Sequence, residues 1–185
     1  LLSLIKKEAK RLNGLVQSIL DLAKLEREGD VLNRSETDLA ELVRDTVESL
    51  VPVARAAGIS LSLAWEGRAS LLVDSQLLAQ AVSNLIVNAI RHSGSKDVVV
   101  SAEKAGRKLQ LVVEDHGVGI PAEHRARIFE RFYRVDAARA AETGGSGLGL
   151  AIVRQIARLH GGDVRLETAS PAGCRFVLEL DLQKP

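Results

Sequence analysis

The spacing of hydrophobic residues changes several times along the chain, and these changes restrict the fold more than any other feature. Helical spacing, with steps of three and four residues, covers four stretches: 5–25, 39–57, 75–92 and 148–159. Short strand-like runs lie between and after them, at 59–63, 71–73, 98–100, 109–113, 164–167 and 176–180. Several of these runs are grouped in hairpins rather than alternating strictly with helices. We therefore expect a helical stem followed by a two-layer α/β sandwich.

The first helical stretch has a heptad pattern that requires a partner. Its apolar residues recur at alternating four- and three-residue steps, at Ile5, Ala9, Leu12, Val16, Ile19 and Ala23. Such a helix fits a helical bundle, and it fits equally well a helix that packs on its own domain. We expect it to end at Gly29 and Asp30.

Capping residues and glycines mark the ends of the other helices. Asp38, followed by Glu41, is a capping pair for the second helix, and Asp74 opens the third. Residues 135–147 have no apolar period and are predicted to form a mobile loop. His160 is expected to meet the dipole at the C-terminal end of the last helix.

Charge and composition exclude several classes of function. With 25 basic and 24 acidic residues the net charge is +1, so neither nucleic acid nor an anionic membrane is expected as a partner. Cys174 is the single cysteine, which excludes an internal disulfide and favours the reducing cytoplasm. The first apolar run is too short to span a membrane. Because the chain does not begin with Met, we expect a piece of a longer protein whose membrane spans would lie in the missing N-terminal part.

Polar residues follow one face of the third helix. Asn84 and Asn88 are four residues apart, and Arg91 and His92 lie on the next turn. Asparagine is a middling helix former, so two at this spacing indicate either hydrogen bonding at a helix edge or ligand binding. An amide oxygen is a suitable ligand for Mg²⁺ when phosphates complete the coordination shell.

An acidic residue and two glycines follow the run at 109–113. Asp115, Gly117 and Gly119 fit an ordinary turn when taken alone. A carboxylate held at a strand end by glycines can also accept the exocyclic amine of adenine. His116 and His124, nearby in the sequence, are interpreted as exposed residues without a role.

A glycine-rich run, residues 144–149, leads directly into the last helix. Unpaired backbone N–H groups and the helix dipole favour phosphate at such a position. No Lys follows the last glycine, as a Walker loop would require, and Leu150 stands where a dinucleotide fingerprint has its third glycine. A flexible linker is the alternative, which the following helix disfavours.

Aromatic and basic residues are concentrated in residues 128–134. Phe129 and Phe132 are equally consistent with a small satellite core. Arg131 and Arg134 could reach a γ-phosphate. The cysteine and the histidines lack the spacing of a zinc site.

Together and in this order, the four segments resemble the N, G1, F and G2 boxes of bacterial sensor histidine kinases, in the ATPase superfamily that includes gyrase, the Hsp90 chaperone and MutL. The matching sequences are SNLIVNAIRHS, DHGVGIP, IFERFYR and GGSGLGLAIV. The resemblance implies a Bergerat-type ATP-binding fold, with a mixed sheet covered by helices on one face. It implies that residues 30–185 form the ATP-binding catalytic domain, with an ATP lid at about 133–147. Residues 1–29 resemble the second helix of an incomplete dimerisation and histidine phosphotransfer hairpin.

The resemblance also implies ATP and Mg²⁺ as ligands. Asn88 is the expected metal ligand, Asn84 its polar companion, and Asp115 the residue that reads adenine. The other expected ATP contacts are Arg91, His92, Gly117, Gly119, Ile120, Phe132, Gly145, Ser146, Gly147, Leu148 and Gly149, with Arg131 and Arg134 as candidate γ-phosphate contacts. Many relatives have Lys and then Tyr where this chain has Arg91 and His92, a change that keeps the charge and a flat ring.

The implied reaction is transfer of the γ-phosphoryl group of ATP to a histidine and then to the receiver domain of a response regulator. No H box with its phosphoacceptor histidine matches this chain, so the acceptor would lie on the absent first helix of the hairpin. The resemblance implies a homodimer formed through the full hairpin, and the cytoplasmic portion of a bacterial inner-membrane sensor. The alternatives are an ATP hydrolase or clamp of the same superfamily, which would have Glu in place of Asn84, and a nucleotide-gated binding module such as an anti-sigma factor.

Overall fold

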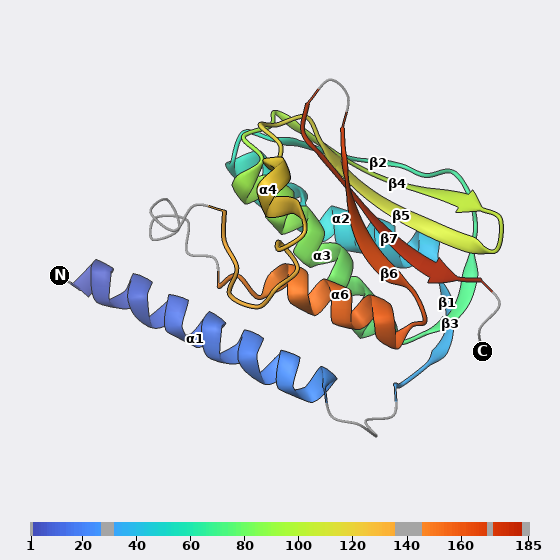
Figure 1. Cartoon of the computed structure of the whole chain (residues 1–185), viewed down its shortest axis with the longest axis horizontal. Coiled ribbons are helices and arrows are strands. Elements are labelled where there is room, and N and C mark those ends of the chain that lie inside the picture. The colour runs from blue at the N-terminus through green and yellow to red at the C-terminus, as the bar shows by residue number, and fades with distance from the viewer. Residues whose placement is uncertain (1, 27–31, 136–145, 170–171, 183–185) are drawn as a thin grey trace.

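The computed structural model describes residues 2–26, 32–135, 146–169 and 172–182 (Figure 1). Its helices are α1 (Leu2–Leu25), α2 (Leu39–Ala56), α3 (Ser75–His92), α4 (Ala122–Arg125) and α6 (Gly149–Leu159). Its strands are β1 (Ser35–Asp38), β2 (Ser60–Ala64), β3 (Ser70–Val73), β4 (Asp97–Ala105), β5 (Lys108–Asp115), β6 (Asp163–Thr168) and β7 (Cys174–Asp181). The predicted helices and strands are confirmed to within a few residues at their ends.

The main sheet has the strand order β2-β4-β5-β7-β6. β2 is parallel to β4, and the other neighbours are antiparallel, so the sheet is mixed. The helices α2, α3 and α6 pack on one of its faces (Figure 1). This arrangement confirms the predicted two-layer architecture and places the C-terminal end of α3 beside the loop that follows β5.

One strand was not predicted. β1 pairs antiparallel with β3, apart from the main sheet, with Ser35 opposite Val73 and Asp38 opposite Ser70. Its sequence, SETD, is polar and has no apolar alternation, so its strand conformation comes from pairing rather than from the burial of side chains.

The hydrophobic core lies between the helices and the inner face of the sheet. α3 is its central element, because its apolar stripe is almost fully buried: Leu78, Ala81, Val82, Leu85, Ile86, Ala89 and Ile90. Burial of each such Val, Leu or Ile side chain adds roughly 1.5–3 kcal/mol to the stability of the folded state. The N-terminus of α3 is capped by the Asp74 carboxylate, which accepts from Leu77 N at 3.1 Å, and Asp38 caps α2 in the same way, as predicted.

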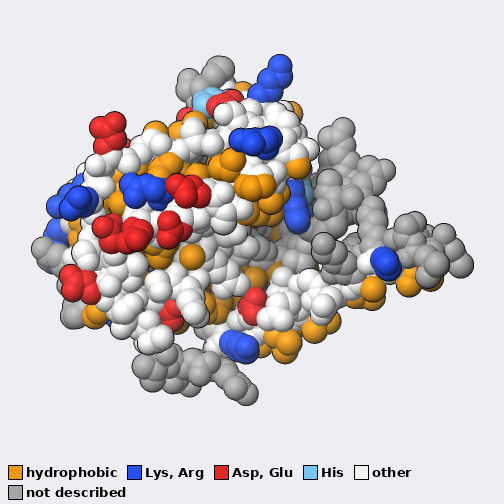
Figure 2. Space-filling view, turned by 180° about the vertical axis from the view of Figure 1, so that it is seen from behind, with side chains coloured by type: hydrophobic (Ala, Val, Ile, Leu, Met, Phe, Trp, Pro, Cys, Tyr) orange, Lys and Arg blue, Asp and Glu red, His pale blue; other side chains and the backbone are white. Residues whose placement is uncertain are grey.

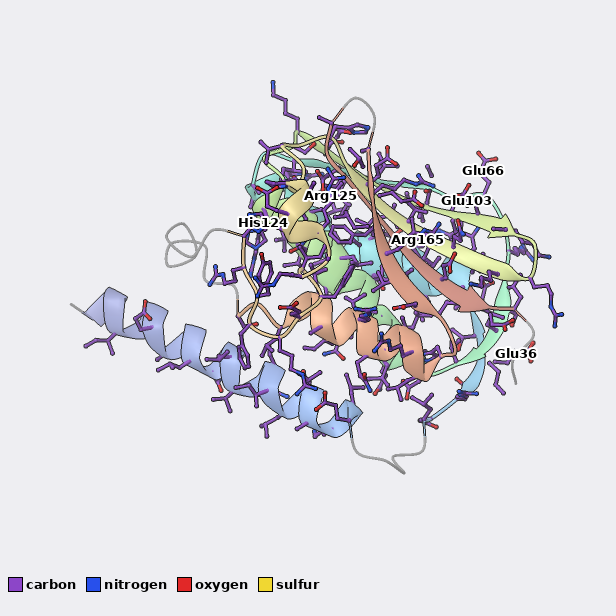
Figure 3. All side chains as sticks on the ribbon, viewed as in Figure 1. Glu36, Glu66, Glu103, His124, Arg125 and Arg165 are labelled. Carbon is purple, nitrogen blue, oxygen red and sulfur yellow. The ribbon has the colours of Figure 1, made fainter. Side chains whose placement is uncertain are left out.

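The opposite face of the sheet carries a network of charged side chains. Arg175 donates to Glu114 at 2.9 Å, and Arg165 donates to Glu167 at 2.8 Å. Arg165 and Glu103, labelled in Figure 3, both belong to this network. Ion pairs near the surface contribute only about 0–1 kcal/mol each to stability, and these are partly exposed, so the fold depends mainly on the helix-covered face.

Among the described side chains of the stem helix α1, those that pack on the rest of the protein lie in its C-terminal half, and the partly buried Leu15 is one of them. Leu22 and Leu25 are buried, Gln80 Nε2 donates to Asp21 Oδ2 at 3.1 Å, and Gln155 Nε2 donates to the Leu25 carbonyl at 3.0 Å. The rest of the apolar seam is exposed along the outer edge of the helix (Figure 2), at Ile5, Leu12, Val16, Ile19 and Leu20. The interpretation as a helix that packs on its own domain is thus confirmed for the C-terminal half of α1, and the helical-bundle interpretation stays a prediction.

α1 ends at Leu25, and the predicted end at Gly29 and Asp30 lies outside the described residues. In the described part of the chain, no helix combines the length and the apolar character that a membrane crossing requires.

His160 joins the C-terminal end of α6 to the N-terminal end of α3. Its buried ring donates through Nδ1 to the Ile156 carbonyl at 2.8 Å and accepts through Nε2 from Asp74 N at 3.0 Å. A ring that accepts through Nε2 is neutral. The position at the helix end was predicted correctly, but His160 does not meet the dipole as a cation. Burial lowers the pKa of His160, and the charge of Arg34 acts in the same direction.

Acidification should destabilise the protein through His160. The pKa of this ring lies below its ordinary value of 6.5 only in the folded state, so the unfolded chain binds the proton first as the pH falls. We expect the free energy of unfolding, measured with urea, to decrease as the pH is lowered from about 7.5 through 6.5 and below. His160→Gln should show a smaller decrease, although it starts about 0.5–3 kcal/mol lower because a buried ring is replaced by a side chain of different shape. Parallel pH profiles for the two proteins would contradict this assignment.

Candidate functional site

The amides of Asn84 and Asn88 lie on the flank of α3, beside its buried stripe. Both residues are half-buried. Within the described part of the chain neither side chain has a hydrogen-bond partner, and no side-chain polar atom is both fully buried and unpartnered. The two amides therefore remain accessible to solvent. Buried or half-buried amides are usually satisfied within the protein, so this pair is available to an external ligand.

Positive charge gathers at the C-terminal end of the same helix. The pKa of His92 is lowered, first by partial burial and then by the nearby charges of Arg134 and Arg91. The charges of both arginines thus act on the His92 ring and favour its neutral form. Arg131 lies elsewhere, in an ion pair with Glu26 of the stem. Of the two candidate γ-phosphate contacts, only Arg134 is brought to Arg91 and His92.

Asp115 ends β5 and is only 2% exposed. Its Oδ1 accepts from Gly117 N at 3.0 Å and from Cys174 N at 3.4 Å. Burial raises the pKa of the Asp115 carboxyl, and these two backbone N–H groups act in the opposite direction. Oδ2 has no hydrogen-bond partner among the described residues, and it is not fully buried. One oxygen thus holds the side chain in place while the other can accept from a ligand.

The loop after Asp115 packs tightly against the end of α3. Val118 N donates to the Ser93 carbonyl at 2.9 Å, and a Cβ at Gly117 would lie 1.9 Å from the same oxygen. Gly119 has φ +71°, which favours glycine. Ile120 is half-buried, and its carbonyl accepts from Arg125 Nε at 2.8 Å. The predicted glycines are therefore required for a close contact between backbone segments and for a turn.

Residues near this loop that sequence reasoning missed also shape the site. Ser93 and Ser95 are buried between α3 and β4, and Ser95 Oγ accepts from His116 N at 3.2 Å. Gly173 has φ +119°, and a Cβ there would lie 2.0 Å from the Asp115 carbonyl. Burial raises the pKa of the neighbouring Cys174 thiol to about 11, so this thiol stays protonated. The sequence offers no local signal for these residues beyond their small size.

The glycine-rich run brings the N-terminus of α6 next to residues 128–135. Gly147 has φ +71°, its carbonyl accepts from Phe132 N at 3.0 Å, and a Cβ on it would lie 2.8 Å from the Phe132 backbone. Ser146 Oγ accepts from Leu148 N at 3.2 Å, and Leu148 is fully buried. Among the described residues no side chain caps α6, which starts at Gly149, so its first N–H groups are available to an anion. Residues 136–145 of the predicted lid, including the expected ATP contact Gly145, lie outside the described residues.

Phe132 has an unusual backbone conformation. Its φ is +61°, and its side chain is exposed. A positive φ at a residue other than glycine costs energy and is common at functional sites. Phe129 behaves differently, because it packs edge-on against Phe176 in the core. The interpretation as a satellite core is therefore wrong for both, because Phe129 packs on the main core and Phe132 is exposed.

Two histidines that were interpreted as residues without a role have partners. His124 is half-buried and forms a hydrogen bond with the Tyr133 hydroxyl at 2.6 Å. His116 is exposed, but its ring lies 3.0 Å from Asp97 Oδ2. The described residues hold no cluster of three or more His, Cys, Asp or Glu side chains suited to a metal ion.

Comparisons with known proteins agree with this geometry. A family model described as "Histidine kinase-, DNA gyrase B-, and HSP90-like ATPase" matches residues 73–184. The Sensor-like histidine kinase SenX3 of Mycobacterium bovis is 35% identical over 174 residues, which are 94% of this chain and 42% of that protein. The Sensor protein RstB of Escherichia coli is 35% identical over 172 residues, which are 93% of this chain and 39% of that protein. The chain thus spans about two fifths of the length of these relatives.

Solved structures show the same fold. The full-length ShkA protein in complex with AMPPNP superposes with a TM-score of 0.83 at 28% identity, covering 96% of this chain and 37% of that one. The ATP-binding domain of PrrB from Mycobacterium tuberculosis superposes with a TM-score of 0.67 at 29% identity, covering 82% of this chain and 99% of that domain. The predicted Bergerat-type ATP-binding fold is confirmed.

Replacement of two glycines by alanine should have opposite effects on stability. Gly117→Ala places a Cβ against the Ser93 carbonyl, so we expect a loss of about 1–3 kcal/mol in the free energy of unfolding. Gly149→Ala, the matched control, meets no atom within 4 Å. At the start of α6 it should be neutral or stabilising by up to about 1 kcal/mol. Urea unfolding of both variants tests this, and equal stability of the two would contradict the close contact.

Proposed function

Because this chain belongs to the family of histidine kinase-, DNA gyrase B- and HSP90-like ATPases, we propose that it binds ATP with Mg²⁺ as the catalytic part of a sensor histidine kinase. One observation carries the proposal: three kinds of ligand-binding group lie on or beside the C-terminal half of α3, because the Asp115 loop bonds to Ser93 and α6 packs on α3 with its last residues against Asp74. They are the accessible amides of Asn84 and Asn88, the unpartnered Oδ2 of Asp115, and the uncapped N-terminus of α6. The AMPPNP complex of ShkA supports a nucleotide as the ligand.

Asp115 is proposed to read the base. An ionised carboxylate is only a hydrogen-bond acceptor, so Oδ2 suits the exocyclic amine of adenine and opposes the carbonyl oxygen at the same position of guanine. The position of Oδ2 is fixed because Oδ1 accepts from two backbone N–H groups. Gly119 and Ile120 would border the base, and His92 is a flat ring on which the charges of Arg134 and Arg91 act.

The triphosphate is proposed to lie between the end of α3 and the start of α6. Arg91 and Arg134 supply positive charge there, and the first N–H groups of α6 point toward an anion by the geometry of any helix N-terminus. Ser146 and Gly147 precede that helix start. Arg131 is the weaker candidate for a γ-phosphate contact, because it is paired with Glu26 of α1.

The residues present fit a magnesium ion bound together with ATP. Mg²⁺ is usually held by one or two protein oxygens while phosphates and water complete its shell, and its charge offsets that of the phosphates. Asn88 offers a half-buried amide oxygen with no partner inside the described part of the protein, and Asn84 lies one turn earlier. Such a site needs no cluster of carboxylates.

Transfer of the γ-phosphoryl group to a histidine fits this chain better than hydrolysis of ATP. Hydrolysis in this superfamily would need a carboxylate at the position of Asn84, and an amide cannot accept the proton of a water molecule at neutral pH. We propose that the γ-phosphoryl group leaves ADP for an imidazole nitrogen on a helix that precedes α1, and then passes to an aspartate of a response regulator. Catalysis by this chain would consist of positioning and charge neutralisation.

The stem is proposed to be the second helix of a dimerisation and phosphotransfer hairpin, spanning residues 1–29, with residues 30–185 as the ATP-binding domain. Support comes from its exposed apolar seam, at Ile5, Leu12, Val16, Ile19 and Leu20, which another helix could cover. The whole protein would act as a homodimeric bacterial membrane sensor whose catalytic part faces the cytoplasm.

Removal of one amide should weaken binding of ATP only when magnesium is present. We expect Asn88→Ala to lower the affinity for ATP with Mg²⁺ by at least about tenfold, because a metal ligand is lost. Its affinity for ATP in excess EDTA should match that of the unmodified chain. Asn13→Ala, on the exposed surface of α1, is the matched control and should leave both affinities unchanged. Calorimetric titration measures all of them, and an unchanged magnesium-dependent affinity in Asn88→Ala would refute the assignment.

A further inference from the structure

We propose that Ser95 is a positioning residue that fixes the Asp115 loop against the C-terminal end of α3 and thereby sets the preference for adenine over guanine nucleotides. The inference rests on the nucleotide binding proposed above and concerns a residue that does not itself touch the nucleotide.

A chain of hydrogen bonds runs through two buried serines, from the last turn of α3 to the residue after Asp115. Ser93 Oγ donates to the Ala89 carbonyl at 2.7 Å and accepts from Ser95 N at 3.0 Å. Ser95 Oγ then donates to the Asp97 carbonyl at 2.8 Å and accepts from His116 N at 3.2 Å. Ser95 therefore connects α3, the start of β4 and the loop after β5.

The bond to His116 N determines the direction of the peptide group that follows Asp115. That N–H belongs to the amide formed with the Asp115 carbonyl, so it lies next to the Cα that carries the base-reading carboxylate. Asp115 also pairs with Val98 and Cys174 in the sheet, and Val118 N donates to the Ser93 carbonyl at 2.9 Å, but none of these contacts uses the His116 N–H. Cys174 N is 3.4 Å from Oδ1, longer than an ordinary N–H···O bond, and Gly117 N belongs to the same loop. Ser95 provides a restraint from outside the loop.

Loss of this restraint should weaken the contacts with the base more than the contacts with the phosphates. Discrimination between adenine and guanine requires Oδ2 to be at hydrogen-bond distance and angle from the ring edge, and hydrogen bonds weaken steeply when misaligned. The groups near the phosphates belong to α3, α6 and residues 128–135, and the Ser95 hydroxyl bonds to none of them. A loosened Asp115 loop should therefore lower the affinity for ATP and leave that for GTP nearly unchanged.

If Ser95 had a purely structural role, its replacement would give a different experimental result. Loss of a buried hydroxyl lowers stability wherever it occurs, so a lower melting temperature alone does not identify a positioning residue. The ratio of the affinities for ATP and GTP is independent of the folded fraction when both are measured on the folded protein. Thr46 provides a matched control, because its nearly buried hydroxyl donates to the Leu42 carbonyl at 2.7 Å within α2.

The test is calorimetry of the complete 185-residue chain with ATP and GTP, each with Mg²⁺, well below the melting temperature. We expect Ser95→Ala to reduce the ATP-to-GTP affinity ratio by about fivefold or more, mainly through weaker ATP binding. Ser95→Thr, which keeps the hydroxyl, should restore the ratio, and Thr46→Val should not change it. Asp115→Asn is the reference variant, and we expect it to lose the preference for ATP over GTP completely. A Ser95→Ala protein with the unmodified ratio would overturn the proposal, whatever its melting temperature.

A second measurement decides the case in which Ser95→Ala does not fold. Hydrogen exchange of the His116 amide in the unmodified chain should be slowed relative to an unprotected amide, since its N–H is bonded to Ser95 Oγ. Exchange at the unprotected rate would overturn the role of Ser95. If the unmodified chain binds ATP but Ser95 has no effect, only this inference fails, whereas an unmodified chain that binds no nucleotide removes the proposed function itself.

Discussion

The candidate site depends on one close contact, between the loop that follows β5 and the C-terminal end of α3. Gly117 lies so near the Ser93 carbonyl that a single added carbon would be 1.9 Å from it. This contact places the carboxylate of Asp115 beside the helix that carries the amides of Asn84 and Asn88. Because α3 is also the central element of the core, the hydrophobic packing that stabilises the fold also holds the site rigid.

The electrostatic properties of the site follow from the same packing. Burial raises the pKa of Asp115, and two backbone N–H groups hold the side chain by one oxygen only. At the same end of α3, partial burial and then the charges of Arg134 and Arg91 lower the pKa of His92. A hydrogen-bond acceptor for a base and a concentration of positive charge for phosphates thus lie at one helix end, as a nucleotide requires.

The sequence was sufficient for most of the fold, and it singled out the polar residues Asn84, Asn88 and Asp115 that the structure places on or beside the C-terminal half of α3. Periodicity and caps located the main helices because both are local properties of the chain. β1 was missed because its residues are polar and its pairing with β3 is long-range. The roles of Ser95 and Gly173 could not be predicted, since each depends on a contact with the Asp115 loop that only the folded chain creates. The neutral ring of His160 likewise depends on a hydrogen bond from Asp74, 86 positions away.

The central claim is that a magnesium-bound adenine nucleotide lies where α3, the loop after Asp115 and the start of α6 meet. The most direct measurement is the change in backbone amide NMR shifts when AMPPNP and Mg²⁺ are added to the ¹⁵N-labelled chain. The account predicts that the largest changes occur at residues 88–92, 115–119 and 146–151. Largest changes on the charged face of the sheet, around Glu103 and Glu179, or no changes at saturating nucleotide, would contradict it.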